Sequence, residues 1–503
     1  MKLFAFAVLT GALSAFAFEP AGWWPLMPLA VAALCELVSR TRSLKQSLAV
    51  GWGFGLGQFV IGLYWIATAF TYQVAMPAWL GWIAVVLLSL YLAIYPALAA
   101  GLAWRFGKER QLVLVLVLAG SWAITEWLRG SMFTGFPWNP IGVVLADSPW
   151  LRSAPYLGTY GLSLLVILGG GALWLALRQR STPAAVIAVG LLAVGLIPPT
   201  HTGPWTDRRP IRVVQPNIGQ QDKWRPGFSE EAARRLAALS MRPGETRPRL
   251  LLWPEAAVTD PIEDARAGGP QARAEFERTR AAALIGPGEY LLTGGLALFA
   301  RDRVNVDGAA NSVYVLGQGG NIFGRYDKAH LVPYGEYLPM RPLLSRIGLS
   351  RLAPGDIDFA SGPGPRTLAL PGWGKVGFQI CYEIVFSGEV VDRSDRPDFI
   401  FNPSNDAWFG RWGPPQHLAQ ARLRAAEEGL PVVRATPTGI SAVIDAHGRI
   451  LGSLPWQAAG VIDAMLPPPA ASPTLFARFG NLIPLLLAFV LLLTGIVLGR
   501  TRR

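Results

Sequence analysis

The stretch KVGFQICYEIVF at residues 375–386 is an apolar run that contains Cys381, Tyr382 and Glu383. Its β-branched and aromatic residues predict a short buried strand, and Cys381 stands where that strand ends. The chain has only two cysteines, and the other, Cys35, lies in a separate apolar run, so nothing in the sequence indicates a disulfide framework. Cys381 is therefore a candidate for a chemical role of its own.

The region around this stretch, from Thr206 onward, mixes strand-like and helix-like patterns. Two amphipathic patterns predict helices, at 230–241 and 417–430. Short apolar runs predict eight strands: IRVVQPNI, RLLLWPEA, EYLLTGG, NSVYVLG, GKVGFQI, DFIFNPSND, LPVVRAT and ISAVIDAHG. Such a mixture is typical of an α/β sandwich in which helices cover the sheets. We expect residues 205–470 to form one such domain, followed by a stiff linker, LPPPAAS.

The rest of the chain is too apolar for a soluble protein, since 51% of all residues are hydrophobic and only 16% are charged. Crossing a hydrocarbon core of roughly 30 Å takes about 20 helical residues. Eight candidate helices lie near 3–18, 23–38, 46–70, 79–104, 111–128, 157–177, 184–198 and 481–499. The first, second and seventh are short, which leaves an interfacial position open for one of them. We expect a membrane domain of seven helices over 1–204, and a last helix with a basic tail over 471–503.

The short loops predict the orientation of these helices, because lysine and arginine near helix ends stay on the cytoplasmic side. The opposite connections hold only Arg129 and Arg152. One side carries Lys2, Arg40, Arg42, Lys45, Arg105, Lys108, Arg110, Arg178, Arg180 and the terminal RTRR. Both termini are thus expected in the cytoplasm and residues 205–470 outside, although a cleaved N-terminal signal stays an alternative to a retained anchor. These loops account for much of the net charge of +12, so no nucleic-acid partner is predicted.

Three polar residues stand where packing alone seldom needs them. Glu255 follows the strand RLLLWPEA, Lys328 lies in RYDKAHLVPYGEYLP with Glu336 eight residues later, and Cys381 ends its strand. Each alone is more simply explained as a rim glutamate, a solvated lysine or a small buried thiol. Together they suit nucleophilic chemistry, because a thiol of pKa about 8.5 needs a base and a cation to react at neutral pH. Glu255 suits the base, Lys328 the cation, and Glu336 a charge that balances the cluster.

The motif order WPE, YDKAHLVPYGEY, CYE and NPSNDAWFG resembles the carbon–nitrogen hydrolase (nitrilase) superfamily. With its helices before and after the domain, nearly the whole chain is similar to the bacterial apolipoprotein N-acyltransferases. The resemblance implies a nitrilase-like αββα sandwich with Glu255 as general base, Lys328 as oxyanion stabiliser and Cys381 as nucleophile. It also implies supporting or substrate-binding roles for Trp224, Glu336, Tyr382 and Glu383.

The reaction implied by this resemblance is acyl transfer in two steps. A phospholipid first gives a fatty acyl group to Cys381, and the α-amine of the diacylglyceryl cysteine that begins an apolipoprotein then takes it. We expect a monomer without a cofactor in the bacterial cytoplasmic (inner) membrane, with its catalytic domain in the periplasm. Physical reasoning also favours a lipid substrate, since withdrawing an acyl chain into water costs about 0.8 kcal/mol per methylene.

Two other functions stay open at this point: a membrane-tethered amidase or nitrilase acting on small C–N substrates, and a non-catalytic transport or assembly module. The four histidines, His201, His330, His417 and His447, lack the spacing of zinc ligands, so we expect no metal. The aromatic-rich segment 129–156 suits either an entrance for lipids or an ordinary interfacial belt.

Overall fold

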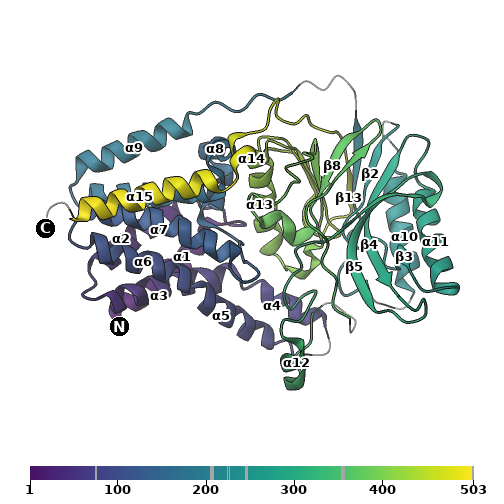
Figure 1. Ribbon diagram of the computed structural model, residues 1–503, viewed down its shortest axis with the longest axis horizontal. Helices are drawn as coiled ribbons and strands as arrows, with labels where there is room; N and C mark the ends of the chain where they lie inside the picture. Colours follow the sequence, from purple (N-terminus) through teal and green to yellow (C-terminus); the bar gives the residue numbers. More distant parts are fainter. Residues whose placement is uncertain are drawn as a thin grey trace.

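The computed structural model describes residues 1–73, 76–203, 209–223, 225, 227–243, 247–352 and 357–500. Helices gather at one end of the molecule and two sheets at the other (Figure 1). The helical end consists of α1 (Lys2–Ser14), α2 (Leu26–Ser39), α3 (Leu44–Gly62), α4 (Ile66–Ala69), α5 (Leu80–Leu92), α6 (Ile94–Gly107), α7 (Gln111–Ser131), α8 (Ala154–Leu177), α9 (Ser181–Gly195), α14 (Leu475–Phe479) and α15 (Leu482–Arg500). The last helix, α15, returns from the sheets to pack against α7 and α8.

Several of these helices have the length and composition of membrane-spanning segments. Within the described residues, four segments meet this test: Leu80–Gly107, Gln111–Ser131, Pro149–Leu177 and Leu482–Arg500. Leu44–Gly62 and Ile66–Tyr72, bent by 47°, make a fifth if the pair is one span. Lys2–Ala17, Leu26–Ser39 and Ser181–Gly195 are apolar but shorter. The three short helices coincide with the three candidates that were short in the sequence, so the long apolar helices are compatible with an integral membrane protein while its number of spans stays a prediction.

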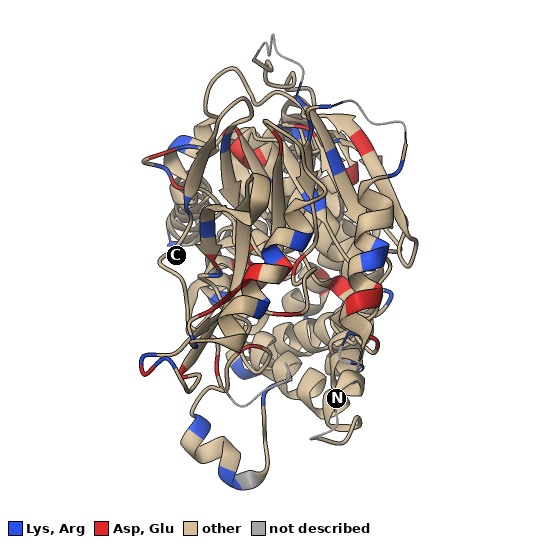
Figure 2. Ribbon diagram, turned by 90° about the vertical axis from the view of Figure 1, so that its right-hand side faces the viewer, with Lys and Arg blue, Asp and Glu red and all other residues tan. Residues whose placement is uncertain are grey.

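The other end of the molecule is a mixed α/β structure with two sheets. The first has the order β13-β1-β2-β4-β5-β6, with β3 paired to β4, and the second the order β12-β11-β10-β9-β8-β7. The strands are β1 (Pro210–Gln215), β2 (Leu250–Leu252), β3 (Glu263–Asp264), β4 (Tyr290–Phe299), β5 (Gly308–Leu316), β6 (Ile322–Asp327), β7 (Thr367–Leu370), β8 (Gly374–Phe378), β9 (Phe399–Pro403), β10 (Val432–Ala435), β11 (Ala442–Ile444), β12 (Ile450–Ser453) and β13 (Gly460–Met465). Acidic and basic residues are interspersed over this part (Figure 2).

The sheets pack face to face, because one apolar cluster draws on both of them. Val213 and Leu252 of the first sheet share this buried core with Phe378 and Phe401 of the second. Separate apolar clusters lie on the outer faces. The first sheet is covered by α10 (Phe228–Ser240) and α11 (Gly269–Ala282), and the second by α13 (Gly413–Glu428) (Figure 1). This layering is the α/β sandwich that the sequence predicted; the short α12 (Arg341–Leu344) lies outside it.

Helix α13 determines how the two ends of the molecule meet. Most of its side chains are buried on every face, because it packs against the second sheet and also contacts α8 of the helical end. The apolar residues among 382–386, which follow β8, share an apolar cluster with Phe59 and Trp65 of the helical end and so face the helices. Cys381 itself belongs to the cluster between the two sheets. The boundaries 1–204, 205–470 and 471–503 stay a prediction.

Candidate active site

Cys381 begins a 3₁₀ turn, η7 (Cys381–Val385), directly after β8. Its φ is +52°, in the left-handed region that residues other than glycine seldom adopt. The thiol-bearing residue is only 5% exposed, and its main-chain carbonyl accepts a hydrogen bond from His417 Nε2 at 3.1 Å. Unusual backbone conformations persist where the surrounding structure holds them, and they cluster at functional sites. The turn therefore marks Cys381 as more than a packing residue.

Glu255 and Glu336 meet at one carboxamide, with the ammonium of Lys328 beside them. Asn311 of β5 donates through Nδ2 to Glu255 Oε1 at 2.7 Å and to Glu336 Oε1 at 3.0 Å. Lys328 follows β6, and its Nζ lies 2.9 Å from Glu336 and 4.0 Å from Glu255 Oε1. All four side chains are buried. Two carboxylates thus share one ammonium and one amide donor away from water.

A glycine makes room for this arrangement. Glu255 lies in the loop that follows β2, and the adjacent strand β4 passes close beneath it at Gly294. A Cβ atom at Gly294 would lie 2.6 Å from the Cα of Glu255 and 2.4 Å from the amide nitrogen of Ala256. Any side chain at position 294 would therefore displace the loop that carries the candidate base.

Burial and mutual charge shift the ionisation of these groups. Burial raises the pKa of Glu255, an effect that Lys328 opposes and Glu336 reinforces. Burial disfavours the ammonium of Lys328, but the carboxylates of Glu336 and Glu255 outweigh it and raise the pKa of this lysine. Burial also raises the pKa of Cys381 well above its usual value, with Glu255 adding to the rise and Lys328 opposing it. A protonated thiol that interacts with a carboxylate of raised pKa is what general-base activation needs.

Glu383 connects two segments by hydrogen bonds: the one that follows Lys328 and the one that carries Cys381. Its Oε1 accepts hydrogen bonds from Tyr326 Oη at 2.8 Å and from the main-chain amides of Ala329 and His330 at 2.7 and 3.0 Å. Its Oε2 accepts from the amide of Ile380 at 2.6 Å. Both carboxylate oxygens of Glu383 therefore hold main-chain amides in place. Because both are engaged in this way, Glu383 is not free to act on a substrate.

Tyr382 connects the Cys381 turn to the helical end. Its ring stacks on Trp138 with centroids 6.4 Å apart and an angle of 12° between the planes, and its hydroxyl donates to the carbonyl of Gly135 at 3.3 Å. Arg129 at the end of α7 holds this part of the segment, since its Nη1 donates to the carbonyls of Phe136 and Trp138. Part of the aromatic segment 129–156 consequently packs directly on the residue beside Cys381.

A second polar group, not predicted from the sequence, lies at Cys381, where α13 and the segment after β9 bring its members together. Ligand atoms of Cys381, Asp406 and His417 lie within 4.8 Å of one another, a spacing compatible with a catalytic triad or a metal ion. However, His417 Nε2 bonds the carbonyl of Cys381, and Arg434 Nη2 lies 2.6 Å from Asp406 Oδ2 and 3.0 Å from His417 Nδ1. A guanidinium within the cluster repels a second cation. We therefore infer that this group stabilises the Cys381 turn. The motif NPSNDAWFG, which contains Asp406, was the feature of the sequence that could have indicated it.

Six of the seven predicted site residues come together: Glu255, Lys328, Cys381, Glu336, Tyr382 and Glu383. Trp224 lies outside the described residues. Its neighbour Lys223, which the sequence analysis did not single out, is buried, and burial lowers its pKa to about 8 against the opposing charge of Glu255. A second lysine therefore lies within electrostatic reach of the candidate base.

Comparison with known proteins covers nearly the whole chain. Residues 10–172 match the apolipoprotein N-acyltransferase N-terminal domain, and residues 211–474 match the carbon–nitrogen hydrolase family. The chain is 38% identical to an apolipoprotein N-acyltransferase of Rhodopseudomonas palustris, over 97% of this chain and 94% of that protein. It is 37% identical to one of Bradyrhizobium diazoefficiens, over 99% and 94%. Among solved structures, a carbon–nitrogen hydrolase from Helicobacter pylori G27 aligns at 16% identity with a TM-score of 0.35, over 52% of this chain and 89% of that one.

Proposed function

This chain belongs to the apolipoprotein N-acyltransferase family, and from that premise we propose that Cys381 carries a fatty acyl group from a phospholipid to the amino terminus of an apolipoprotein. The observation that supports this most strongly is the buried set of a thiol, an ammonium and a carboxylate of raised pKa, placed where the sheets meet the long apolar helices. Water is scarce in such a site, which protects a thioester from hydrolysis.

In the first step, Glu255 takes the proton from the thiol of Cys381 while the sulfur attacks the ester carbonyl carbon of the phospholipid. The ammonium of Lys328 stabilises the negative charge on the carbonyl oxygen. The ester C–O bond then breaks, and the leaving alkoxide of the lysophospholipid takes the proton from Glu255. The product of this step is a thioester on Cys381.

In the second step, the α-amine of the diacylglyceryl cysteine attacks the thioester carbonyl carbon. Lys328 again stabilises the oxyanion, and Glu255 takes a proton from the attacking nitrogen. The C–S bond breaks, the sulfur regains the proton, and an amide leaves the site. Because the donor product departs before the acceptor reacts, this sequence of steps has ping-pong kinetics.

The remaining residues support this set. Glu336 partly compensates the positive charge of Lys328. Glu383 positions the main chain on both sides of the site, and Tyr382 packs the Cys381 turn against the helical end. Trp224 is proposed to contact substrate, on the strength of the family resemblance alone. We further propose that helices within 1–204 and 471–503 span the inner membrane of a bacterium, with both termini cytoplasmic and residues 205–470 periplasmic. The distribution of basic residues in the short loops supports that orientation.

The test is a mass-spectrometric search for a hydroxylamine-labile acyl group on the peptide that contains Cys381, after the purified enzyme has met phospholipid vesicles. We expect the adduct in the natural enzyme and in Cys35→Ala, a control that keeps the nucleophile. We expect none in Cys381→Ala. Release of ammonia from small amides without any acyl adduct would support an amidase instead and contradict the proposal.

A further inference from the structure

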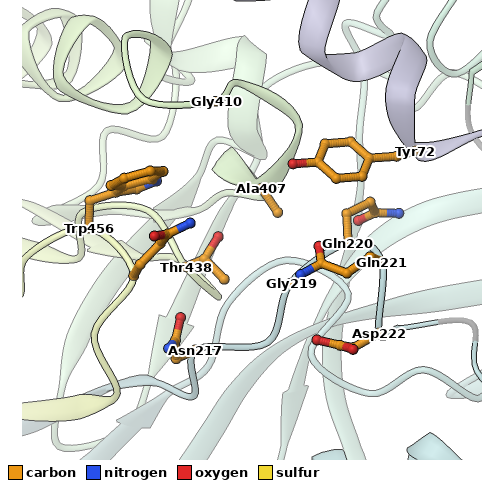
Figure 3. A pocket seen from close by; sticks show the side chains of 11 residues that line it. Tyr72, Asn217, Gly219, Gln220, Gln221, Asp222, Ala407, Gly410, Thr438 and Trp456 are labelled. Atoms are coloured by element: carbon orange, nitrogen blue, oxygen red, sulfur yellow. The ribbon is translucent and has the colours of Figure 1, made fainter. Parts of the chain in front are cut away.

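A polar cavity lies beside the catalytic turn and has no part in the steps above. Its volume is about 320 Å³, within the range of roughly 300–1,000 Å³ that ligand pockets occupy. Most of its lining belongs to the α/β part, whereas Tyr72 comes from η2 (Phe70–Tyr72) at the helical end (Figure 3). The cavity therefore lies at the junction between the α/β part and the helical end.

The lining is rich in neutral hydrogen-bonding groups. Among the lining residues that the structure describes, Asp222 alone is charged, and it pairs with Arg225 at 3.0 Å. Tyr72 and Thr438 contribute hydroxyls, and Asn217, Gln220 and Gln221 contribute carboxamides (Figure 3). Gln457 adds a fourth carboxamide. A carboxamide donates and accepts as a peptide group does, whereas phosphate is bound by lysine, arginine or clustered N–H groups. The lining suits a peptide main chain better than a phosphate head group.

Asn405 joins this cavity to the nucleophile. Its Nδ2 donates to Oε1 of Gln220, a lining residue, at 3.2 Å. Its main-chain amide also favours the ionised form of Cys381, which lowers the pKa of that thiol against the effect of burial. Asn405 is only 7% exposed, and its Oδ1 has no hydrogen-bond partner within the described part of the chain. Buried polar atoms of native proteins are nearly always paired, so this unpaired carbonyl oxygen offers an acceptor that an N–H group of a substrate can fill.

Resting on the acyl-transfer function proposed above, we propose that this cavity holds the first residues of the acceptor peptide, and that Asn405 Oδ1 accepts a hydrogen bond from the attacking α-amine. The amine and the peptide chain both belong to the first residue of the acceptor. An amine placed at the thioester on Cys381 therefore brings the chain past Asn405 and Gln220 into the cavity. Asn405 orients the nucleophile, while the proton still goes to Glu255.

The experiment separates the two halves of the reaction in the full-length enzyme. Phospholipid vesicles first load Cys381, and the isolated acyl-enzyme then meets one of three amines: a five-residue peptide beginning with S-diacylglyceryl cysteine, the amide of S-diacylglyceryl cysteine without further residues, or hydroxylamine. Gln221→Trp reduces the free volume of the cavity. Gln318→Trp, at an exposed glutamine of η5 (Gln318–Gly320) outside the lining, is the matched control.

We expect Gln221→Trp to slow transfer to the five-residue peptide about tenfold or more, mainly by raising KM, while the amide without further residues, hydroxylamine and thioester formation change less than about twofold. Gln318→Trp should leave all four rates as they are. Equal losses with both lipidated acceptors, a loss of thioester formation, or no change at all would overturn the assignment. A lost thioester step would indicate a donor head group in the cavity instead. Failure of the natural enzyme to form any thioester would contradict the acyl-transfer function itself.

Asn405→Ala tests the other half of the proposal. We expect it to lower the rate constant for transfer to both lipidated amines about tenfold, through kcat rather than KM, with thioester formation retained. Asn405→Ser, which keeps an oxygen acceptor, should recover part of that rate. A parallel loss in both half-reactions, without recovery by serine, would assign Asn405 to support of the Cys381 turn and overturn its role toward the amine.

Discussion

The ammonium of Lys328 lies 2.9 Å from the carboxylate of Glu336, closer than to any oxygen of the candidate base. The lysine charge is therefore largely compensated before a substrate arrives. Without that compensation Lys328 would hold Glu255 ionised and lower its basicity, since an opposite charge within about 4–6 Å favours the charged form. In the proposed mechanism, the pair of carboxylates thus lets one cation stabilise the oxyanion without lowering the basicity of Glu255.

Glu336→Gln should shift the pH dependence of thioester formation. The charge of Glu336 raises the pKa of Glu255, so its removal lowers that pKa and moves the acid limb of kcat/KM to lower pH. A weaker base also abstracts the thiol proton more slowly. We therefore expect the rate of thioester formation on the pH plateau to fall by up to about tenfold. The measurement is acyl-enzyme formation against pH. Glu275→Gln, at an exposed glutamate of α11, is the control and should leave the limb in place.

Asn311→Ala should shift the same limb in the opposite direction. The hydrogen bond from Asn311 stabilises the ionised form of Glu255, so its loss raises the pKa of that carboxyl and moves the limb to higher pH. Loss of a buried bond to a charged group also destabilises the fold by about 1.5–3 kcal/mol. Thermal unfolding and the pH profile check these effects. A limb that moves the same way in both variants would show that Asn311 does not act through Glu255.

The sequence predicted the interior of the α/β part better than its borders. All eight predicted strands are present, and every one lies inside a sheet. The four missed edge strands are β6, β7, β12 and β13. An edge strand has a neighbour on one side only and is partly exposed, so residues such as those of β12 carry no continuous apolar run. The two-residue β3 and the polar helix α11 lacked a usable pattern as well.

Within the site, sequence motifs indicated the charged residues. They did not indicate the residues that become neighbours of the site only in the folded structure. Asn311 lies in a strand whose other residues are almost all buried, and no motif distinguished this carboxamide from its neighbours in the sequence. His417 begins a predicted amphipathic helix, and only the packing of α13 on the second sheet brings it to Cys381. Such contacts depend on tertiary structure between segments far apart in the chain, which periodicity does not encode.

Tyr382 should matter through its ring more than through its hydroxyl. The hydroxyl makes one long bond, to Gly135 at 3.3 Å, while the ring contacts Trp138 and Phe386. Tyr382→Phe should keep thioester formation within about threefold, because only a weak hydrogen bond is lost. Tyr382→Ala removes a buried aromatic ring and should cost about 3–5 kcal/mol of stability, with a larger loss of activity. Equal activities of the two variants would contradict this division.

Lys223 offers a test of burial through the pH dependence of stability. Its folded-state pKa of about 8 lies below the unfolded value near 10.5, so the folded state binds fewer protons between these limits and stability rises as pH rises through them. Below pH 8 the buried ammonium destabilises the fold by about 3 kcal/mol, the equivalent of this shift at 1.36 kcal/mol per unit. Lys223→Met should therefore raise Tm at pH 7 and lose most of that advantage by about pH 10. Chemical or thermal unfolding at both pH values tests this prediction. A gain in stability that is independent of pH would mean that Lys223 is solvated in the folded protein.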